Sequence, residues 1–178
     1  MPIIRPHRRE WLAKRPREQY VDQLATEIQE KVTTDPRPTI FEVPMDESGT
    51  YHIIVVWDEW EDIPLDERAS IVTEAYAIYD AGRAPEDAIA PRITAAIGAT
   101  VDEVIQLGLL PYQIVPTRKG YWGALPEKVR QAMVDKGAIE LPGGHDPYLA
   151  FPSRQMAEEA FRHLTENVPE GHWHRSYE

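Results

Sequence analysis

The sequence predicts an α+β protein in which helices pack on one face of small mixed or antiparallel sheets, arranged as two consecutive α/β units. Three observations support this class. Apolar residues change repeatedly between helical spacing and β-branched runs along the chain. Turn signals separate these segments, and 16 prolines interrupt them. With 178 residues, of which 42% are hydrophobic, the chain is long enough to bury a core.

The first unit is predicted to begin with a helix over about residues 17–33, where apolar residues recur at helical spacing. The segment TTDPRP ends it, because residues before proline disfavour the helical conformation. Residues 39–57 read as an antiparallel hairpin with DESG at its turn. Its second strand is nearly all apolar, as a central strand covered on both faces would be. A further helix starts at Leu65, and RITAAIG (92–98) suits either a short strand or a helical turn.

Residues 100–103, TVDE, form a capping box, in which the Thr100 hydroxyl and the Glu103 carboxylate bond to amides at the start of a helix. Gly108 suits a left-handed cap at the end of that helix. The second unit follows as strand, helix, strand, strand, helix, strand. Its elements are LLPYQIVP, ALPEKVRQAMVDKGA, AIELP, YLAF, a helix capped by Ser153, and HWHRSY. We divide the chain into a basic arm at 1–17 and two units at 18–108 and 109–178. The sequence allows these two units either to share one core or to form two separate lobes.

The net charge of −11 is unevenly distributed. Residues 1–18 hold six Lys/Arg against two Asp/Glu, residues 19–116 hold five against nineteen, and residues 117–178 hold eight against nine. This pattern argues against nucleic-acid binding by the whole surface. It is compatible with a local basic contact, or with the basic arm folding onto the acidic middle.

Several functional classes are excluded by the residues that the sequence lacks. The absence of cysteine excludes disulfides, thiolate nucleophiles and cysteine-ligated metals, and fits a cytoplasmic protein. No apolar run approaches the ~20 residues of a membrane helix, and the basic arm has no following apolar region, so we do not expect it to be a secretory signal. The motifs G-x-S-x-G, G-x-x-x-x-G-K and G-x-G-x-x-G are absent. We therefore predict a protein without catalytic machinery and without a cofactor.

The segment WDEWEDIPLDE, residues 57–67, concentrates carboxylates around two tryptophans. Asp66 and Glu67 have a sufficient explanation in the dipole of the following helix. Tryptophans beside charged residues recur at protein interfaces, where they supply buried contact area. We therefore predict an adaptor or regulatory protein that binds another protein through this surface, unless the tryptophans are instead a lid on the core. The predicted surface consists of Trp57, Asp58, Glu59, Trp60, Glu61 and Asp62.

Strand alternation would send Asp58 and Glu59 to opposite faces, so a shared metal or acid–base site is disfavoured unless the chain bends there. Two alternatives belong to other classes. A nucleic-acid-binding module would use the basic arm and the GYWG loop, through Arg8, Arg9, Arg15, Arg118, Lys119, Tyr121 and Trp122. A metal-dependent enzyme would bring histidines to the acidic residues, since imidazole binds zinc. Its candidates are His145, His172 and His174, which nothing in the sequence forces together, so we predict no metal.

The segment HIIVVWDEWEDIPLDERASIVTEA resembles a BolA-like domain, in an order of helix, strand, strand, helix and strand over about residues 21–104. This resemblance implies a small non-enzymatic α/β domain that partners monothiol glutaredoxins and helps to bind iron–sulfur clusters. Two departures bear on the cluster. Ala69 stands where the family usually has a histidine, and ITAA (93–96) replaces its histidine-bearing strand motif. The resemblance therefore implies the fold and not the cluster-binding role.

Residues 109–166 resemble a KH nucleic-acid-binding module more loosely. LLPYQIVPT matches its first strand, and GYWG (120–123) has the G-x-x-G form that clamps a nucleic-acid backbone. Arg118 and Lys119 stand just before this loop. However, the helix that should precede the loop has no room, and Tyr121 and Trp122 replace the usual basic residue.

Overall fold

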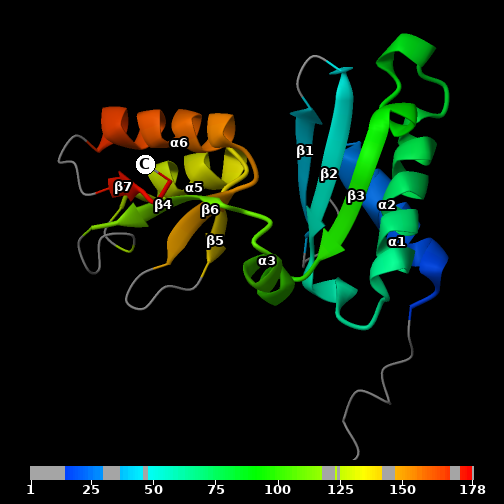
Figure 1. Cartoon of the computed structure of the whole chain (residues 1–178), viewed down its shortest axis with the longest axis horizontal. Coiled ribbons are helices and arrows are strands. Elements are labelled where there is room, and N and C mark those ends of the chain that lie inside the picture. The colour runs from blue at the N-terminus through cyan, green and yellow to red at the C-terminus, as the bar shows by residue number, and fades with distance from the viewer. Residues whose placement is uncertain are drawn as a thin grey trace, which may run out of the picture.

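The structure is a computed structural model of the chain, and it describes residues 15–29, 37–45, 48–117, 123, 125–141, 147–168 and 173–177. Within these residues the chain forms a three-stranded sheet and a four-stranded sheet, each packed against helices. The predicted α+β class is confirmed. Figure 1 shows the two units next to each other, with helix α3 between their lower ends.

The first unit contains the sheet of order β1-β2-β3. Strands β1 and β2 are antiparallel and form the predicted hairpin, whereas β2 and β3 are parallel. The segment at 92–98 that suited two conformations is largely strand β3. The first predicted helix is shorter than expected, because α1 ends at Ile28, and residues 30–36 lie outside the described part of the chain. The elements are α1 (Arg17–Ile28), β1 (Thr39–Met45), β2 (Thr50–Val56), the 3-10 helix η3 (Asp58–Trp60), α2 (Leu65–Asp80), η4 (Pro85–Asp87), η5 (Ala90–Arg92) and β3 (Ile93–Ala99).

Strand β2 is the central strand and is covered on both faces, as its continuous apolar run predicts. Ile53 and Val55 point into a cluster formed with α1 and α2. Ile54 and Val56 point the opposite way, into a cluster that includes residues of the second unit. Figure 1 shows the same arrangement, with α1 and α2 on one side of the sheet and the second unit on the other.

Helix α3 (Val101–Leu107) connects the two sheets, and its predicted ends are confirmed. The Thr100 hydroxyl accepts a hydrogen bond from the Glu103 amide at 3.2 Å, and the Glu103 carboxylate accepts one from the Thr100 amide at 2.9 Å. Gly108 adopts the left-handed conformation at φ 61°. A helix of seven residues has little stability of its own, so these end contacts matter more here than in a long helix.

The second unit contains the antiparallel sheet of order β5-β6-β4-β7. Its order of strand, helix, strand, strand, helix, strand is that of a split βαβ motif. Ser153 caps its last helix, as predicted, by accepting a hydrogen bond from the Met156 amide. The elements are β4 (Tyr112–Pro116), α5 (Glu127–Asp135), β5 (Ile139–Leu141), β6 (Tyr148–Phe151), α6 (Arg154–Asn167) and β7 (Trp173–Arg175).

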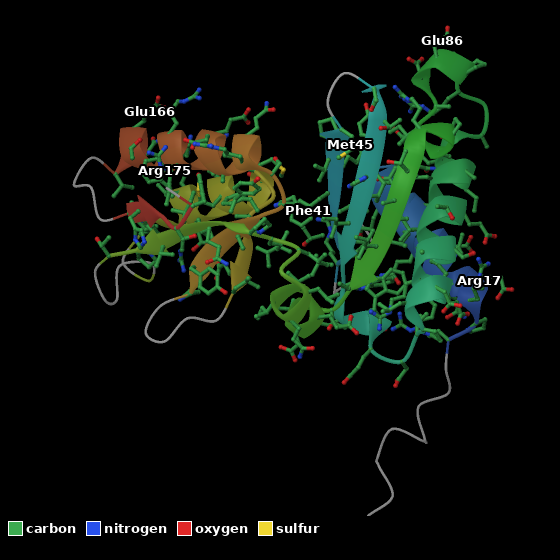
Figure 2. The ribbon with its side chains drawn as sticks, in the orientation of Figure 1. Arg17, Phe41, Met45, Glu86, Glu166 and Arg175 are labelled. Atoms are coloured by element: carbon green, nitrogen blue, oxygen red, sulfur yellow. The ribbon has the colours of Figure 1, made fainter. Side chains whose placement is uncertain are left out.

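An apolar cluster joins the two units. It includes Phe41 from β1 together with Ile139 and Ala150 from the second sheet. Figure 2 shows Phe41 at the side of β1 that faces the second unit. Gly137 permits this approach, because a Cβ there would lie 2.9 Å from Met156 Cε and 3.3 Å from Phe41 Cε1. Each unit thus has its own cluster beneath its helices, and the two share a third.

Candidate functional site

The two tryptophans of the predicted partner-binding surface are buried within the protein itself, so the alternative in which they cover the core is the one observed, and they cannot supply contact area to a partner. Trp57 is 2% exposed and Trp60 is 0% exposed. The physical reason is that the strand ends at Val56 and the chain turns at once into η3, which carries Trp60 back onto the core. The indole Nε1 of Trp60 donates a hydrogen bond to Val55 O at 3.1 Å, which satisfies its polar group inside the core.

Both tryptophans pack with an aromatic residue of helix α1. The Tyr20 ring stacks on Trp60 with centroids 6.2 Å apart and meets Trp57 edge-on at 5.7 Å. The two indoles meet edge-on at 5.3 Å. This arrangement places the tryptophans beneath the acidic segment, as a lid on the core.

The turn after β2 also changes where the carboxylates lie. Asp58 and Glu59 belong to η3 and not to a continuing strand, so the expectation that alternation separates them does not apply. Asp66 and Glu67 lie in the first turn of α2, as predicted. The bend that the metal and acid–base hypotheses required is therefore present, and it brings these side chains around one depression.

This depression has a volume of about 400 Å³, and we call it the acidic hollow. All four carboxylates of the predicted surface line it, and neither tryptophan does. Sequence reasoning missed the contribution of Glu67, which it assigned to helix initiation alone, and that of Tyr20 on α1. The lining residues are Arg15, Arg17, Tyr20, Asp58, Glu59, Glu61, Asp62, Ile63, Glu67 and Ile71.

Two arginines from the end of the basic arm lie on this acidic surface. Arg15 Nη1 is 3.3 Å from Glu59 Oε2. Arg17 donates a hydrogen bond to Ser70 Oγ at 2.9 Å and pairs with Glu74 on α2. For these two residues, the folding of the arm onto the acidic middle is confirmed. Figure 2 labels Arg17 at the lower end of the first unit, where α1 begins.

The negative field of the hollow acts on Tyr20, which lies on its wall. Partial burial is the main reason why the pKa of the Tyr20 hydroxyl is raised above its usual value, and the nearby Glu59 raises it further. The Arg15 guanidinium acts in the opposite direction. Asp62 and Glu67 also raise the pKa of Tyr20, so the carboxylates of the hollow together outweigh Arg15 at this residue.

Arg68 supports the wall of the hollow from inside. It is 3% exposed, and its guanidinium donates hydrogen bonds to Ile63 O at 2.6 Å and to Gly98 O at 3.1 Å. It also binds both carboxylate oxygens of Glu103 on α3. Sequence reasoning assigned no role to this arginine. Its burial could have been recognised from its position, because Arg68 lies four residues before Val72 on the buried face of α2 and is a charged residue among apolar ones.

Gly98 on β3 is required by the packing of this region. A Cβ at this position would lie 2.8 Å from Arg68 Cβ and 3.0 Å from Trp60 Cε2. We expect Gly98→Ala to lower the free energy of unfolding by about 1–3 kcal/mol, because neither neighbour can move without loss of a hydrogen bond. Urea unfolding measures the change. The control is Gly123→Ala, where a Cβ meets no atom within 4 Å, and an equal loss in both variants would contradict the explanation.

The remaining candidate residues are separated from this site or lie outside the described chain. His174 is exposed on β7, and His145 and His172 lie outside the described residues. Arg8, Arg9, Arg118, Lys119, Tyr121 and Trp122, proposed for nucleic-acid binding, also lie outside them. No group of three or more His, Cys, Asp or Glu in the described part of the chain is placed to hold a metal ion.

The fold and the hollow together define an α+β protein with an acidic hollow at one end of its first unit. Comparison with family models, with curated proteins and with solved structures found no match for the chain. The BolA-like and KH-like resemblances remain predictions. None of the described helices is long and apolar enough to cross a membrane.

Proposed function

We propose that the protein is a non-catalytic adaptor or regulatory protein, which binds a basic segment of a partner protein in the acidic hollow. The observation that carries this proposal is the contact between Arg15 and Glu59, because it shows the hollow holding a guanidinium group. Five carboxylates line the hollow, against two arginines. This excess of negative charge favours a partner of opposite charge and accelerates its association.

The hollow is a depression, so it is better suited to receive a single side chain of a partner than to form a flat protein–protein interface. Its volume of about 400 Å³ accommodates long side chains, and the half-buried Ile63 adds apolar surface to its wall. Arginine and lysine combine an apolar stem with a charged head, so they can use both parts of such a wall. The buried tryptophans stabilise the floor beneath and make no direct contact with the ligand in this proposal.

The exposure of the carboxylates also supports binding over catalysis. Asp58, Glu61, Asp62 and Glu67 are exposed, and Glu59 is half-buried. Catalytic acids and bases are usually placed in partly buried settings that perturb their protonation. Exposed carboxylates act on a partner mainly by charge, which sets its orientation and association rate.

A charge-reversal experiment tests the proposed function. We expect the double variant Glu59→Lys/Glu61→Lys to bind a short arginine–glycine peptide at least about tenfold more weakly, because two attractive contacts become repulsive. Fluorescence anisotropy of the labelled peptide at low salt measures the affinity. Added salt should weaken binding to the parent protein, since exposed charges are screened.

The matched control is Glu86→Lys/Asp87→Lys, which makes the same change in net charge on η4. Figure 2 labels Glu86 at the end of the first unit opposite to Arg17, so this pair lies far from the hollow. The control should retain most of the parent affinity. Equal losses in the two double variants, or no binding by the parent protein, would exclude the hollow as the binding surface.

A further inference from the structure

The acidic hollow is already occupied in part by a side chain of its own protein. Arg15 lies two residues before the first residue of α1, and its guanidinium pairs with Glu59 on η3. The contact is open to solvent, since the Arg15 side chain is 46% exposed and that of Glu59 is 26% exposed. A ligand cation that approached Glu59 would therefore meet Arg15 first.

We infer that Arg15 is an internal competitor for the hollow, and that the partner is recognised through an arginine side chain that displaces it. This inference rests on the proposed function and adds the ligand group and the regulation of the same site. The chain contributes a guanidinium at the position where the partner's guanidinium would bind. Arg15 holds Oε2 of Glu59 and places a positive charge beside it, so occupation by Arg15 lowers the affinity for a second cation.

Arg15 and Arg17 differ in how firmly they are held. Arg17 is the first residue of α1 and bonds to Ser70 and Glu74 of α2. These contacts hold α1 against α2, so Arg17 is part of the folded structure around the hollow. Arg15 lies outside the helix and reaches Glu59 across the hollow. Displacement of Arg15 therefore leaves the α1–α2 contacts intact, and the site can open without unfolding.

An arginine fits this site better than a lysine does. The guanidinium is planar and presents several N–H donors, which suits a surface with carboxylates on several sides, whereas an ammonium acts as a compact point charge. Asp58, Glu61 and Asp62 line the same hollow as Glu59, so a guanidinium bound there faces negative charge on more than one side. We therefore expect an arginine–glycine peptide to bind more tightly than a lysine–glycine peptide of equal length.

The weakness of an exposed ion pair sets the size of the effect. Such a pair is favoured over its open state by a factor of about 1.4–5, so the open state that receives the partner is a minority. Apparent affinity falls in proportion to the competent fraction. Removal of the competitor should therefore tighten binding of the partner segment by about two- to six-fold.

The experiment compares Arg15→Gln with the parent protein in titrations with the arginine–glycine peptide. We expect about two- to six-fold tighter binding by Arg15→Gln, and a smaller gain by Arg15→Lys, which keeps the competing charge but not the planar set of donors. The matched control is Arg83→Gln. Arg83 is similarly exposed and lies just beyond the other end of α2, beside Asp80, so it changes net charge equally away from the hollow.

The outcomes separate the inference from the proposed function. Equal affinity of the parent and Arg15→Gln, with clear binding by both, would overturn the internal competitor and leave the binding function intact. Equal tightening by Arg83→Gln would also overturn it, because the effect would then reflect net charge alone. Absence of peptide binding by both proteins would overturn the proposed function together with the inference.

Discussion

Replacement of Trp60 by alanine is expected to lower the free energy of unfolding by about 3–5 kcal/mol, the range for loss of a large buried aromatic side chain. Trp60 is completely buried and packs against Tyr20 and Trp57. Truncation leaves a cavity among these rings and leaves Val55 O without the hydrogen bond from the indole. These losses add to the lost burial of apolar surface.

Chemical denaturation followed by circular dichroism measures this change without dependence on the mutated indole. The control is Leu65→Ala at the start of α2, where the side chain is exposed and the expected change is within about 0.5 kcal/mol. Trp60→Phe should fall between the two, because it keeps the ring packing and loses the hydrogen bond. A loss below about 1 kcal/mol in Trp60→Ala would contradict the assignment of Trp60 to the core.

The elements of the fold were largely predictable because their signals are local. The β-branched run before Trp57 predicts a strand buried on both faces, and Thr100 with Glu103 predicts the start of α3. The strand at 93–99 was harder to predict from the sequence, since its mixture of small and apolar residues suits a helical turn equally well. Whether the units share a core was left open, because Phe41 and Ile139 meet across about a hundred residues of chain.

The candidate site was predictable only in part, for a related reason. The carboxylates that follow Trp57 were recognised by their density, and they do line the hollow. The burial of Trp60 was not predicted, because an extension of the strand and a turn into η3 both place a tryptophan near charged residues. The turn is favoured by long-range packing, in which Gly98 of β3 leaves space for the indole.

The contribution of Arg15 to the site depends on tertiary structure in the same way. In sequence it is one of several basic residues in an arm, and the charge pattern allowed either an external ligand or the acidic middle as its partner. Its pairing with Glu59 follows from the position of α1 against α2, which places the start of α1 beside η3. Charge counting thus predicted the type of contact but not the residues that make it.

The second large effect is expected for Arg68→Met, which should lower the free energy of unfolding by about 3–5 kcal/mol near neutral pH. The variant keeps the apolar stem and removes the guanidinium, so Ile63 O and Gly98 O lose their donors and Glu103 loses its ion pair. The Glu103 side chain is 32% exposed and can recover some hydration, which favours the lower end of this range. Urea unfolding of both proteins measures the difference.

The stability lost in Arg68→Met should depend on pH, and the direction of this dependence follows from the titration of Glu103. Chiefly through the hydrogen bond from Arg68, the pKa of the Glu103 carboxyl is lowered below its usual value of 4.5, although partial burial opposes the shift. A carboxyl with a lowered pKa in the folded state stabilises that state above the pKa of the unfolded chain, and this stabilisation is lost as the pH falls through the folded pKa. The gap in unfolding free energy between Arg68→Met and the parent protein should therefore narrow as the pH falls below 4.5.

Glu103→Gln provides the independent check of this pH dependence. Its amide oxygen still accepts a hydrogen bond from Arg68, so the loss near neutral pH should be smaller, about 1–2 kcal/mol. Because glutamine does not titrate, the variant should also lose the part of the acid destabilisation that the parent protein owes to Glu103. If the parent protein and Glu103→Gln lost stability in parallel as the pH fell, the Arg68–Glu103 ion pair would not be what holds α3 to β3 and α2.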